Sequence, residues 1–187
     1  MTLPALFVSE IPGQPLPGWE ALLGPQERSR YLAATAPKRK LQFLATRVLL
    51  RRALERELGF PAAGFEITAE AGQGPRLLNL KRPLFASLSH TDGACAVLLS
   101  ETPCGVDIED ASRLREFPDL AKNAFNGDEL AIFEKNPVPE NFYKLWTIKE
   151  AIYKAGQPCA WLGQLSFKQY RVCAALPLTG LQNLVIW

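Results

Sequence analysis

The chain has 187 residues, 48% of them hydrophobic and 21% charged, and a formal net charge of +2 at pH 7. Such a length can bury a sizeable core, either in one domain or in two small halves packed together. The small net charge gives no reason to expect a nucleic-acid partner. No apolar run approaches the ~20 residues of a membrane span, and the N-terminus lacks the pattern of a signal peptide, so we expect a cytoplasmic protein without a membrane partner.

The first half of the chain is predicted to hold a strand, two helices and four short strands. Pro37 suits the first turn of the longer helix, and Gly59 and Pro61 end it. Thr91-Asp92-Gly93 marks a hairpin between the last two strands. The expected ranges are 3–8, 25–34, 37–58, 65–68, 77–80, 84–88 and 94–100, with a Pro- and Gly-rich loop at 12–18.

The second half is predicted to hold a strand, three helices and two more strands. Each half thus combines one long helix with several strands, and the least interrupted transition lies near 101–103. We therefore expect an α+β protein with two mainly antiparallel halves, 1–102 and 103–187. The expected ranges in the second half are 104–108, 117–124, 127–135, 140–155, 164–173 and 183–187.

Cysteine and histidine usage bears on metal binding. The four cysteines are scattered without a Cys-x-x-Cys pair, and His90 is the single histidine. A zinc site needs several such ligands at close spacing, so zinc is not expected. We expect reduced thiols, as in a cytoplasmic protein.

The segment Gly-Val-Asp-Ile-Glu at 105–109 places two acids on one predicted strand face. Val106 and Ile108 alternate with Asp107 and Glu109, so the strand would bury the first pair and present the second. Acids at i and i+2 lie about 7 Å apart, within reach of one small cation. The alternative is that the two acids form a solvated strand face.

The segment Trp-Thr-Ile-Lys-Glu-Ala-Ile-Tyr-Lys at 146–154 adds a third acid and two lysines on a predicted helix. Glu150 and Lys154 would share a polar stripe with Tyr143 and Thr147, beside an apolar arc of Phe142, Leu145 and Ile152. Clustered acids suit a hard cation, and adjacent lysines suit a phosphate-bearing substrate. The alternative is an ordinary surface i,i+4 ion pair.

Arg47 falls on the stripe that the long helix of the first half should bury. Phe43, Arg47, Leu50 and Leu54 recur at i, i+4, i+7 and i+11. A buried guanidinium group requires an anionic partner, because leaving it unpaired carries a large desolvation cost. The helical spacing alone leaves two candidates, an internal carboxylate or a bound anion.

The order of these segments resembles that of the 4′-phosphopantetheinyl transferases, in particular the larger single-chain group that activates surfactin synthetase. The resemblance runs from about Lys38 to Lys154. Gly74-Pro75 departs from the family pattern, since the usual intervening lysine is absent, and Arg76 is a candidate substitute for its charge. The matching segments are Phe43–Arg47, Gly74-Pro75, Ser89-His90 and the two motifs at 105–109 and 146–154.

The resemblance implies two pseudo-symmetric α/β halves with the active site in the cleft between them. It also implies transfer of 4′-phosphopantetheine from coenzyme A to a serine of an acyl or peptidyl carrier protein, with release of adenosine 3′,5′-bisphosphate. Small relatives with one half per chain must trimerise, whereas this chain carries both sets of motifs. We therefore expect a monomer.

The residue roles follow from the same resemblance. Mg²⁺ would be held by Asp107, Glu109 and Glu150, and the catalytic set would be Asp107, Glu150 and Lys154. Coenzyme A would be bound by Arg47 at the 3′-phosphate, by Gly74 and Pro75 at the adenine, and by Lys38, Ser89, His90, Lys149 and Lys154.

Two roles stay open on the sequence. The proton of the attacking serine would pass to Glu150 or to a metal-bound water. Glu129 either joins the metal shell or caps a helix, and we favour the cap. Alternative functions are a Mg²⁺-dependent hydrolase of nucleotides or phosphate esters, a non-catalytic coenzyme A-binding module, and an adaptor that docks carrier proteins.

Overall fold

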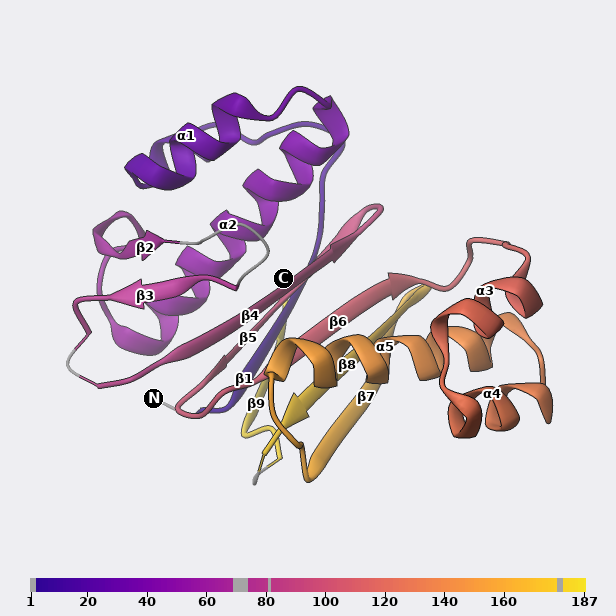
Figure 1. The fold of residues 1–187 in the computed structure, drawn as a ribbon. Coiled ribbons are helices and arrows are strands. Elements are labelled where there is room, and N and C mark those ends of the chain that lie inside the picture. The colour runs from indigo at the N-terminus through magenta and orange to yellow at the C-terminus, as the bar shows by residue number, and fades with distance from the viewer. Residues whose placement is uncertain (1–2, 69–73, 81, 178–179) are drawn as a thin grey trace.

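The computed structural model describes residues 3–68, 74–80, 82–177 and 180–187, which fold into two sheets covered by helices (Figure 1). The first sheet has the strand order β2-β3-β4-β5-β1-β9 and the second has the order β6-β8-β7. Every described strand pair except β1–β9 is antiparallel. The expected α+β class with mainly antiparallel sheets is confirmed.

The bounds of most elements lie close to the predicted ranges. The strands are β1 Ala5–Glu10, β2 Glu66–Thr68, β3 Arg76–Leu78, β4 Phe85–Thr91, β5 Ala94–Ser100, β6 Gly105–Asp110, β7 Trp161–Phe167, β8 Tyr170–Leu176 and β9 Asn183–Ile186. The helices are α1 Pro25–Ala33, α2 Pro37–Leu58, α3 Phe117–Ala124, α4 Gly127–Glu134 and α5 Pro139–Ala155, with short 3₁₀ turns at Glu20–Leu22 and Ala62–Gly64. Helix α2 ends at Gly59 in the left-handed conformation, and the two-residue turn Asp92–Gly93 joins β4 to β5 as predicted.

Three apolar layers hold the sheets and the two long helices together. Helix α2 packs on one face of the first sheet through a core that includes Leu50, Leu54 and Phe7. The other face of that sheet meets the second sheet through residues such as Leu98 and Ile108. Helix α5 covers the outer face of the second sheet, and no helix among the described residues is long and apolar enough to cross a membrane.

The prediction of one strand at 164–173 was wrong, because this stretch is part of the hairpin of β7 and β8. Lys168 adopts a positive φ of 52° at the turn, a conformation that the sequence did not signal with glycine or asparagine. Strand β9 pairs in parallel with β1, so the last strand of the predicted half 103–187 lies in the first sheet. The boundary between 102 and 103 stays a prediction.

Helix α5 approaches β6 more closely than the predicted apolar arc implied. Phe142 is buried as expected, but Leu145 and Ile152 are only partly buried. The fully buried positions are instead Thr147 and Ala151. These small side chains let the helix backbone reach the strand that carries Asp107, and Lys154 of α5 forms an ion pair with Asp107.

Gly105 occupies the point of closest approach between β6 and α5. A Cβ atom at this position would lie 1.8 Å from the carbonyl oxygen of Ala151 and 2.8 Å from the backbone nitrogen of Ala155. We expect Gly105→Ala to lower the free energy of unfolding by about 2 kcal/mol, since a helix and a strand must move apart to admit the methyl group. Urea denaturation would measure this loss, and Gly127→Ala, where the Cβ meets open space, is the control. Equal stability of both variants would contradict the prediction.

Candidate active site

Strand β4 of the first sheet lies beside β6 of the second, and serine hydroxyl groups join them. The Ser87 Oγ atom accepts a hydrogen bond from the Val106 backbone nitrogen at 3.0 Å, and the Ser89 Oγ atom accepts one from the Ile108 nitrogen at 3.3 Å. Both serines are buried. They fix the register of the two strands, and so the position of Asp107 between them.

Asp107 is the buried carboxylate at this junction, with 4% of its surface exposed. Its Oδ1 atom accepts hydrogen bonds from Ser89 Oγ at 2.8 Å and from Lys154 Nζ at 2.7 Å. Lys154 also donates to the Val106 carbonyl oxygen at 3.2 Å. The Oδ2 atom of Asp107 is buried and has no hydrogen-bond partner among the described residues. A buried carboxylate oxygen in this state can accept a further cation or hydrogen-bond donor.

The other two predicted metal ligands lie nearby but are differently engaged. Glu109 accepts hydrogen bonds from Trp146 Nε1 at 3.2 Å and from Thr91 Oγ1 at 3.4 Å. Burial, and then the charge of Asp107, raise the pKa of Glu109 above its ordinary value. Glu150 is half-buried and makes no hydrogen bond or ion pair within the described part of the chain. A bound cation would offset the burial of Glu109 and its repulsion from Asp107, and it would pair with the free carboxylate that Glu150 presents in the described part of the chain.

Asp107 and Glu109 interact electrostatically on β6, but the three acids do not form a complete set of metal ligands. Among the described residues, no group of three or more Asp, Glu, His or Cys side chains is arranged to hold a metal ion. Lys154 forms an ion pair with the Oδ1 atom of Asp107. The unpartnered Oδ2 atom of Asp107 and the unpaired Glu150 nevertheless fit a hard cation, which prefers carboxylate oxygens and keeps part of its water shell.

Residues from both halves line one cavity of ≈ 610 Å³ next to Asp107. The cavity brings together six of the predicted site residues, which lie far apart in the sequence. They are Arg47, Gly74, Pro75, His90, Glu150 and Lys154. Arg30, Phe43, Thr46, Ala86, Ser87, Leu88 and Tyr153 complete the lining.

Three predicted coenzyme A ligands, Lys38, Ser89 and Lys149, do not line this cavity, and Ser89 contacts Asp107 instead. Lys38 forms an exposed ion pair with Asp92 at 2.6 Å and borders a different depression. Lys149 forms an ion pair with Glu129 at 3.0 Å. Glu129 also accepts a hydrogen bond from the Asn126 backbone nitrogen in a capping box, in line with the favoured helix-cap role.

Arg47 lines the cavity from α2 and is 94% buried, with 6% of its surface exposed. Its Nε atom lies 3.9 Å from Glu27 Oε1, so an internal carboxylate is present, though beyond hydrogen-bond distance. Its Nη1 atom has no hydrogen-bond partner among the described residues. Burial lowers the pKa of Arg47 to about 10, so the group is charged at pH 7 and can pair with a further anion.

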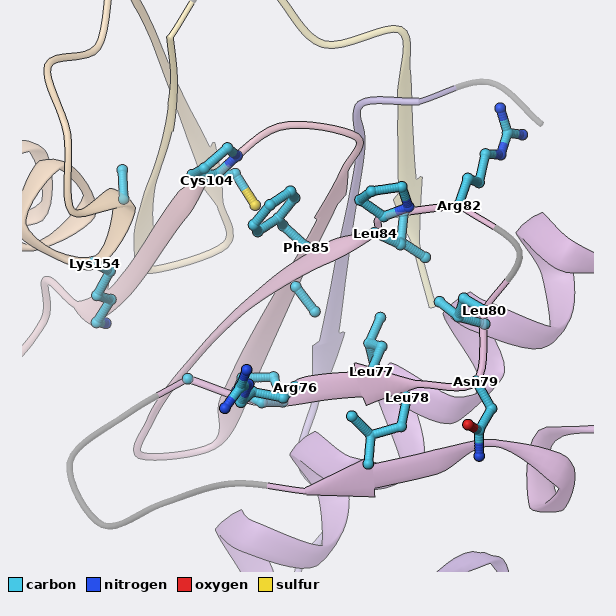
Figure 2. Close-up of a pocket in the computed structure, with 16 residues that line it drawn as sticks. Arg76, Leu77, Leu78, Asn79, Leu80, Arg82, Leu84, Phe85, Cys104 and Lys154 are labelled. Carbon is cyan, nitrogen blue, oxygen red and sulfur yellow. The ribbon is translucent and has the colours of Figure 1, made fainter.

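A second cavity of ≈ 600 Å³ adjoins the first (Figure 2). Both cavities are bordered by Gly74, Pro75, Ala86 and Lys154. Figure 2 shows Lys154 on the side of α5, and Leu80 and Leu84 at the opposite end. Arg76, the candidate substitute for the missing family lysine, lines this second cavity and not the first.

His90 is exposed at the first cavity and is surrounded by positive charge. Desolvation by the surrounding protein lowers its pKa from the ordinary value of 6.5, and the charges of Lys154, Arg39 and Arg47 lower it further, against an opposing effect of Asp107. The imidazole is therefore neutral at pH 7 when no anion is bound. It can donate one hydrogen bond to a phosphate, and a bound anion would favour its protonated form.

The lowered pKa of His90 predicts how stability depends on pH. The unfolded chain binds a proton near pH 6.5 more readily than the folded chain, so His90 lowers the free energy of unfolding as the pH falls below about 6.5. Urea denaturation at pH 7.5 and 5.5 should show a larger loss in the wild type than in His90→Gln. Adenosine 3′,5′-bisphosphate should reduce that difference. An equal loss of stability in both proteins would refute the lowered pKa of His90.

The sequence did not predict several residues that shape this site. Ser87 was within reach of prediction, because it precedes Ser89 by two positions on the same strand face. Trp146 lies in the second motif, yet its hydrogen bond to Glu109 depends on the packing of α5 against β6. Glu27 and Arg51 form a buried ion pair that no local pattern indicated.

A cavity that gathers a buried arginine of α2 with a lysine and a carboxylate of α5, beside the buried carboxylate of Asp107, defines a candidate site for a polyanionic ligand. The model of the 4′-phosphopantetheinyl transferase N-terminal domain matches residues 27–100, and that of the 4′-phosphopantetheinyl transferase superfamily matches residues 103–176. The chain is 36% identical over 137 residues to the 4′-phosphopantetheinyl transferase AcpT of Salmonella typhi, a match that covers 70% of this chain and 67% of the relative. The chain belongs to the 4′-phosphopantetheinyl transferase family.

Two further relatives support this membership. AcpT of Salmonella typhimurium is 35% identical over 136 residues, covering 70% of this chain and 67% of the relative. A putative 4′-phosphopantetheinyl transferase of Synechocystis is 32% identical over 146 residues, covering 75% of this chain but 59% of the relative. The chain therefore matches less than two thirds of the length of that protein. These relatives do not identify the surfactin-synthetase-activating group, which stays a prediction.

Proposed function

We propose that the chain transfers 4′-phosphopantetheine from coenzyme A to a serine of an acyl or peptidyl carrier protein. The observation that supports this most strongly is the cavity of ≈ 610 Å³, which joins Arg47 of the first half to Glu150 and Lys154 of the second, beside Asp107. Arg47 and Asp107 each keep a buried polar atom without a partner among the described residues. The Arg47 Nη1 atom is a donor and suits a phosphate oxygen. The Asp107 Oδ2 atom is an acceptor and suits a cation.

Coenzyme A would bind with its adenosine end in the first half. Arg47 would contact the 3′-phosphate, and Gly74 and Pro75 would lie beside the adenine. His90 would donate a hydrogen bond to a phosphate. Ser89 already donates to Asp107 Oδ1 and accepts from the Ile108 nitrogen, so we assign it the further role of holding Asp107 in place.

In the reaction the serine oxygen forms a bond to the phosphorus atom of the phosphopantetheine group. The bond from that phosphorus to the bridging pyrophosphate oxygen breaks, and adenosine 3′,5′-bisphosphate leaves. The serine proton passes to Glu150 or to water. Lys154 supplies positive charge close to the phosphates, where negative charge builds up as the bond breaks.

Magnesium would be held by Asp107, with Glu150 and Glu109 as the other carboxylates of the site. When bound, it supplies charge neutralisation at the leaving pyrophosphate oxygen. The chain's own contribution is the buried position of Asp107, which Ser89 fixes, and the half-buried carboxylate of Glu150 on a rigid helix.

A single chain provides residues of both halves to the cavity, and we therefore propose an active monomer. A phosphate-ester hydrolase would also use acids and lysines, but it has no use for a buried arginine on the far side of the cavity. A coenzyme A-binding module or a carrier adaptor has no use for the unpaired carboxylate of Glu150.

Mass spectrometry of a carrier protein incubated with the chain, coenzyme A and Mg²⁺ separates these functions. Transfer adds a phosphopantetheine arm of about 340 Da to the carrier, whereas hydrolysis, binding and docking leave its mass unchanged. A carrier with its serine replaced by alanine is the matched control. An unmodified carrier across a panel of fatty-acid, polyketide and peptide-synthetase carriers would refute the proposed activity.

A further inference from the structure

Glu27 is a buried carboxylate on α1 that lies between two arginines of α2. It is 3% exposed, and it is not one of the residues that line the cavity. Arg51 is fully buried and donates from both Nε and Nη2 to Glu27 Oε2, and its Nη1 atom donates to the Ala62 carbonyl oxygen at 2.8 Å. Arg47 lies one helical turn before Arg51 and borders the cavity. Glu27 is thus the link between an interior ion pair and the cavity arginine.

The two oxygens of Glu27 differ in their partners. Oε2 accepts both bonds from Arg51 and another from the Gly24 backbone nitrogen at 3.0 Å. Oε1 is buried, has no hydrogen bond among the described residues and lies 3.9 Å from Arg47 Nε. Arg51 and Gly24 therefore hold the carboxylate so that its second oxygen faces Arg47.

The charges of this group do not cancel. One carboxylate faces two guanidinium groups, which leaves one positive charge in excess in a buried environment. An anion in the cavity would neutralise this excess charge at Arg47, whose Nη1 atom lacks a hydrogen-bond partner among the described residues. The Arg47 guanidinium carbon also lies 5.2 Å from the centre of the Phe43 ring, a contact that favours one orientation.

We propose that Glu27 is a positioning residue for Arg47, and that it thereby sets the preference of the cavity for ligands with a 3′-phosphate. The inference rests on the proposed function, because it takes the anion at Arg47 to be that phosphate. Glu27 acts from behind the guanidinium group, at Nε, and leaves the terminal nitrogens for the ligand. It touches neither substrate nor reacting atoms.

Two opposing effects decide the sign of a substitution. Removing the Glu27 charge would increase the net positive charge and so attract an anion more strongly. It would also leave two buried guanidinium groups one turn apart without a counter-ion, so that they repel each other and Arg47 loses its orientation. Because the carboxylate is within 3.9 Å of Nε and the cluster is buried, we expect the loss of orientation to dominate.

The experiment uses the full chain and two simple probes. Calorimetry gives the affinities for adenosine 3′,5′-bisphosphate and adenosine 5′-phosphate, which differ only in the 3′-phosphate, and their ratio is the readout. The variants are Glu27→Gln, Arg47→Ala and the double variant, with Val48→Ala as a control that removes buried apolar volume from the next position on α2. Thermal unfolding is measured for each variant.

We expect Glu27→Gln to lower the ratio about fivefold, and Val48→Ala to leave it unchanged even if it loses as much thermal stability. The double variant should have the ratio of Arg47→Ala alone, since Glu27 acts through Arg47. If Glu27→Gln does not fold, Glu27→Asp is used instead, because it keeps the charge but moves the carboxylate away from Arg47. We expect this variant to lower the ratio of affinities roughly threefold.

The outcomes separate the two proposals. A wild-type chain without preference for the bisphosphate, or an Arg47→Ala variant that keeps the preference, refutes the 3′-phosphate site and with it the role of Glu27. A preference that Arg47→Ala abolishes but Glu27→Gln or Glu27→Asp leaves unchanged or increases refutes the role of Glu27 alone. Glu27 would then be only the structural partner of Arg51.

Discussion

Replacing Asp107 with asparagine is expected to lower the rate of phosphopantetheine transfer by about 10³-fold, the size of effect seen when a main electrostatic contact to a transition state is removed. The substitution keeps the side-chain volume and the Oδ1 acceptor of Ser89 and Lys154. It removes the charge from the buried carboxylate that would hold the proposed cation. Because the substitution also weakens the ion pair with Lys154, thermal unfolding is measured for each variant and rates are compared at a temperature where each is folded.

Asp110→Asn is the matched control, because Asp110 lies on the same strand but its Oδ1 atom accepts from Ser112, whereas that of Asp107 accepts from Ser89 and Lys154. Glu150→Gln should impair transfer as strongly as Asp107→Asn. Glu109→Gln should impair it less, since Glu109 is already held by Trp146 and Thr91 and water can complete a Mg²⁺ shell. A wild-type rate for Asp107→Asn in metal-depleted buffer with added Mg²⁺ would refute the role of Asp107.

The local patterns of the sequence predicted most elements, because their signals are short-range. Pro37 and Gly59 bound α2, and Asp92-Gly93 forms the predicted hairpin turn. The β7–β8 turn was missed because Lys168 adopts its positive φ without a glycine. The parallel pairing of β9 with β1 joins residues about 180 positions apart in the chain, and no local pattern reports such a contact.

The site was predictable where the chemistry lies in a motif and not where it depends on a distant partner. Asp107, Glu150 and Lys154 belong to the two motifs, and the packing of α5 on β6 at Gly105 brings Lys154 into contact with Asp107. The pairs of Lys38 with Asp92 and of Lys149 with Glu129 join separate elements. Each pairing neutralises a lysine that the family pattern alone had assigned to coenzyme A.

Arg47 shows how a single residue can satisfy both interpretations that its sequence position allowed. The buried stripe of α2 predicted that the guanidinium group needs an anion, either internal or bound. Glu27 supplies the internal anion, but at 3.9 Å and shared with Arg51. A bound phosphate would be the second anion.

The second large expected effect concerns the Arg47 Nη1 atom, which has no hydrogen-bond partner among the described residues. Arg47→Ala should reduce the preference for coenzyme A over 3′-dephospho-coenzyme A by about 1.5–3 kcal/mol, roughly 10- to 150-fold in the ratio of dissociation constants, the range for a charge-assisted hydrogen bond. Affinity for 3′-dephospho-coenzyme A itself should change little. Both constants can be measured by calorimetry without a carrier protein.

Arg52→Ala provides the control, because Arg52 is an exposed arginine on the same helix. Long-range attraction between positive charge and coenzyme A would weaken in both variants and would fall with added salt, since exposed charges are screened beyond a Debye length of about 10 Å at 0.1 M salt. A contact inside the cavity would be lost only in Arg47→Ala and would depend less on salt. If Arg47→Ala weakened both ligands equally, Arg47 would serve the interior ion pair with Glu27 and not the 3′-phosphate.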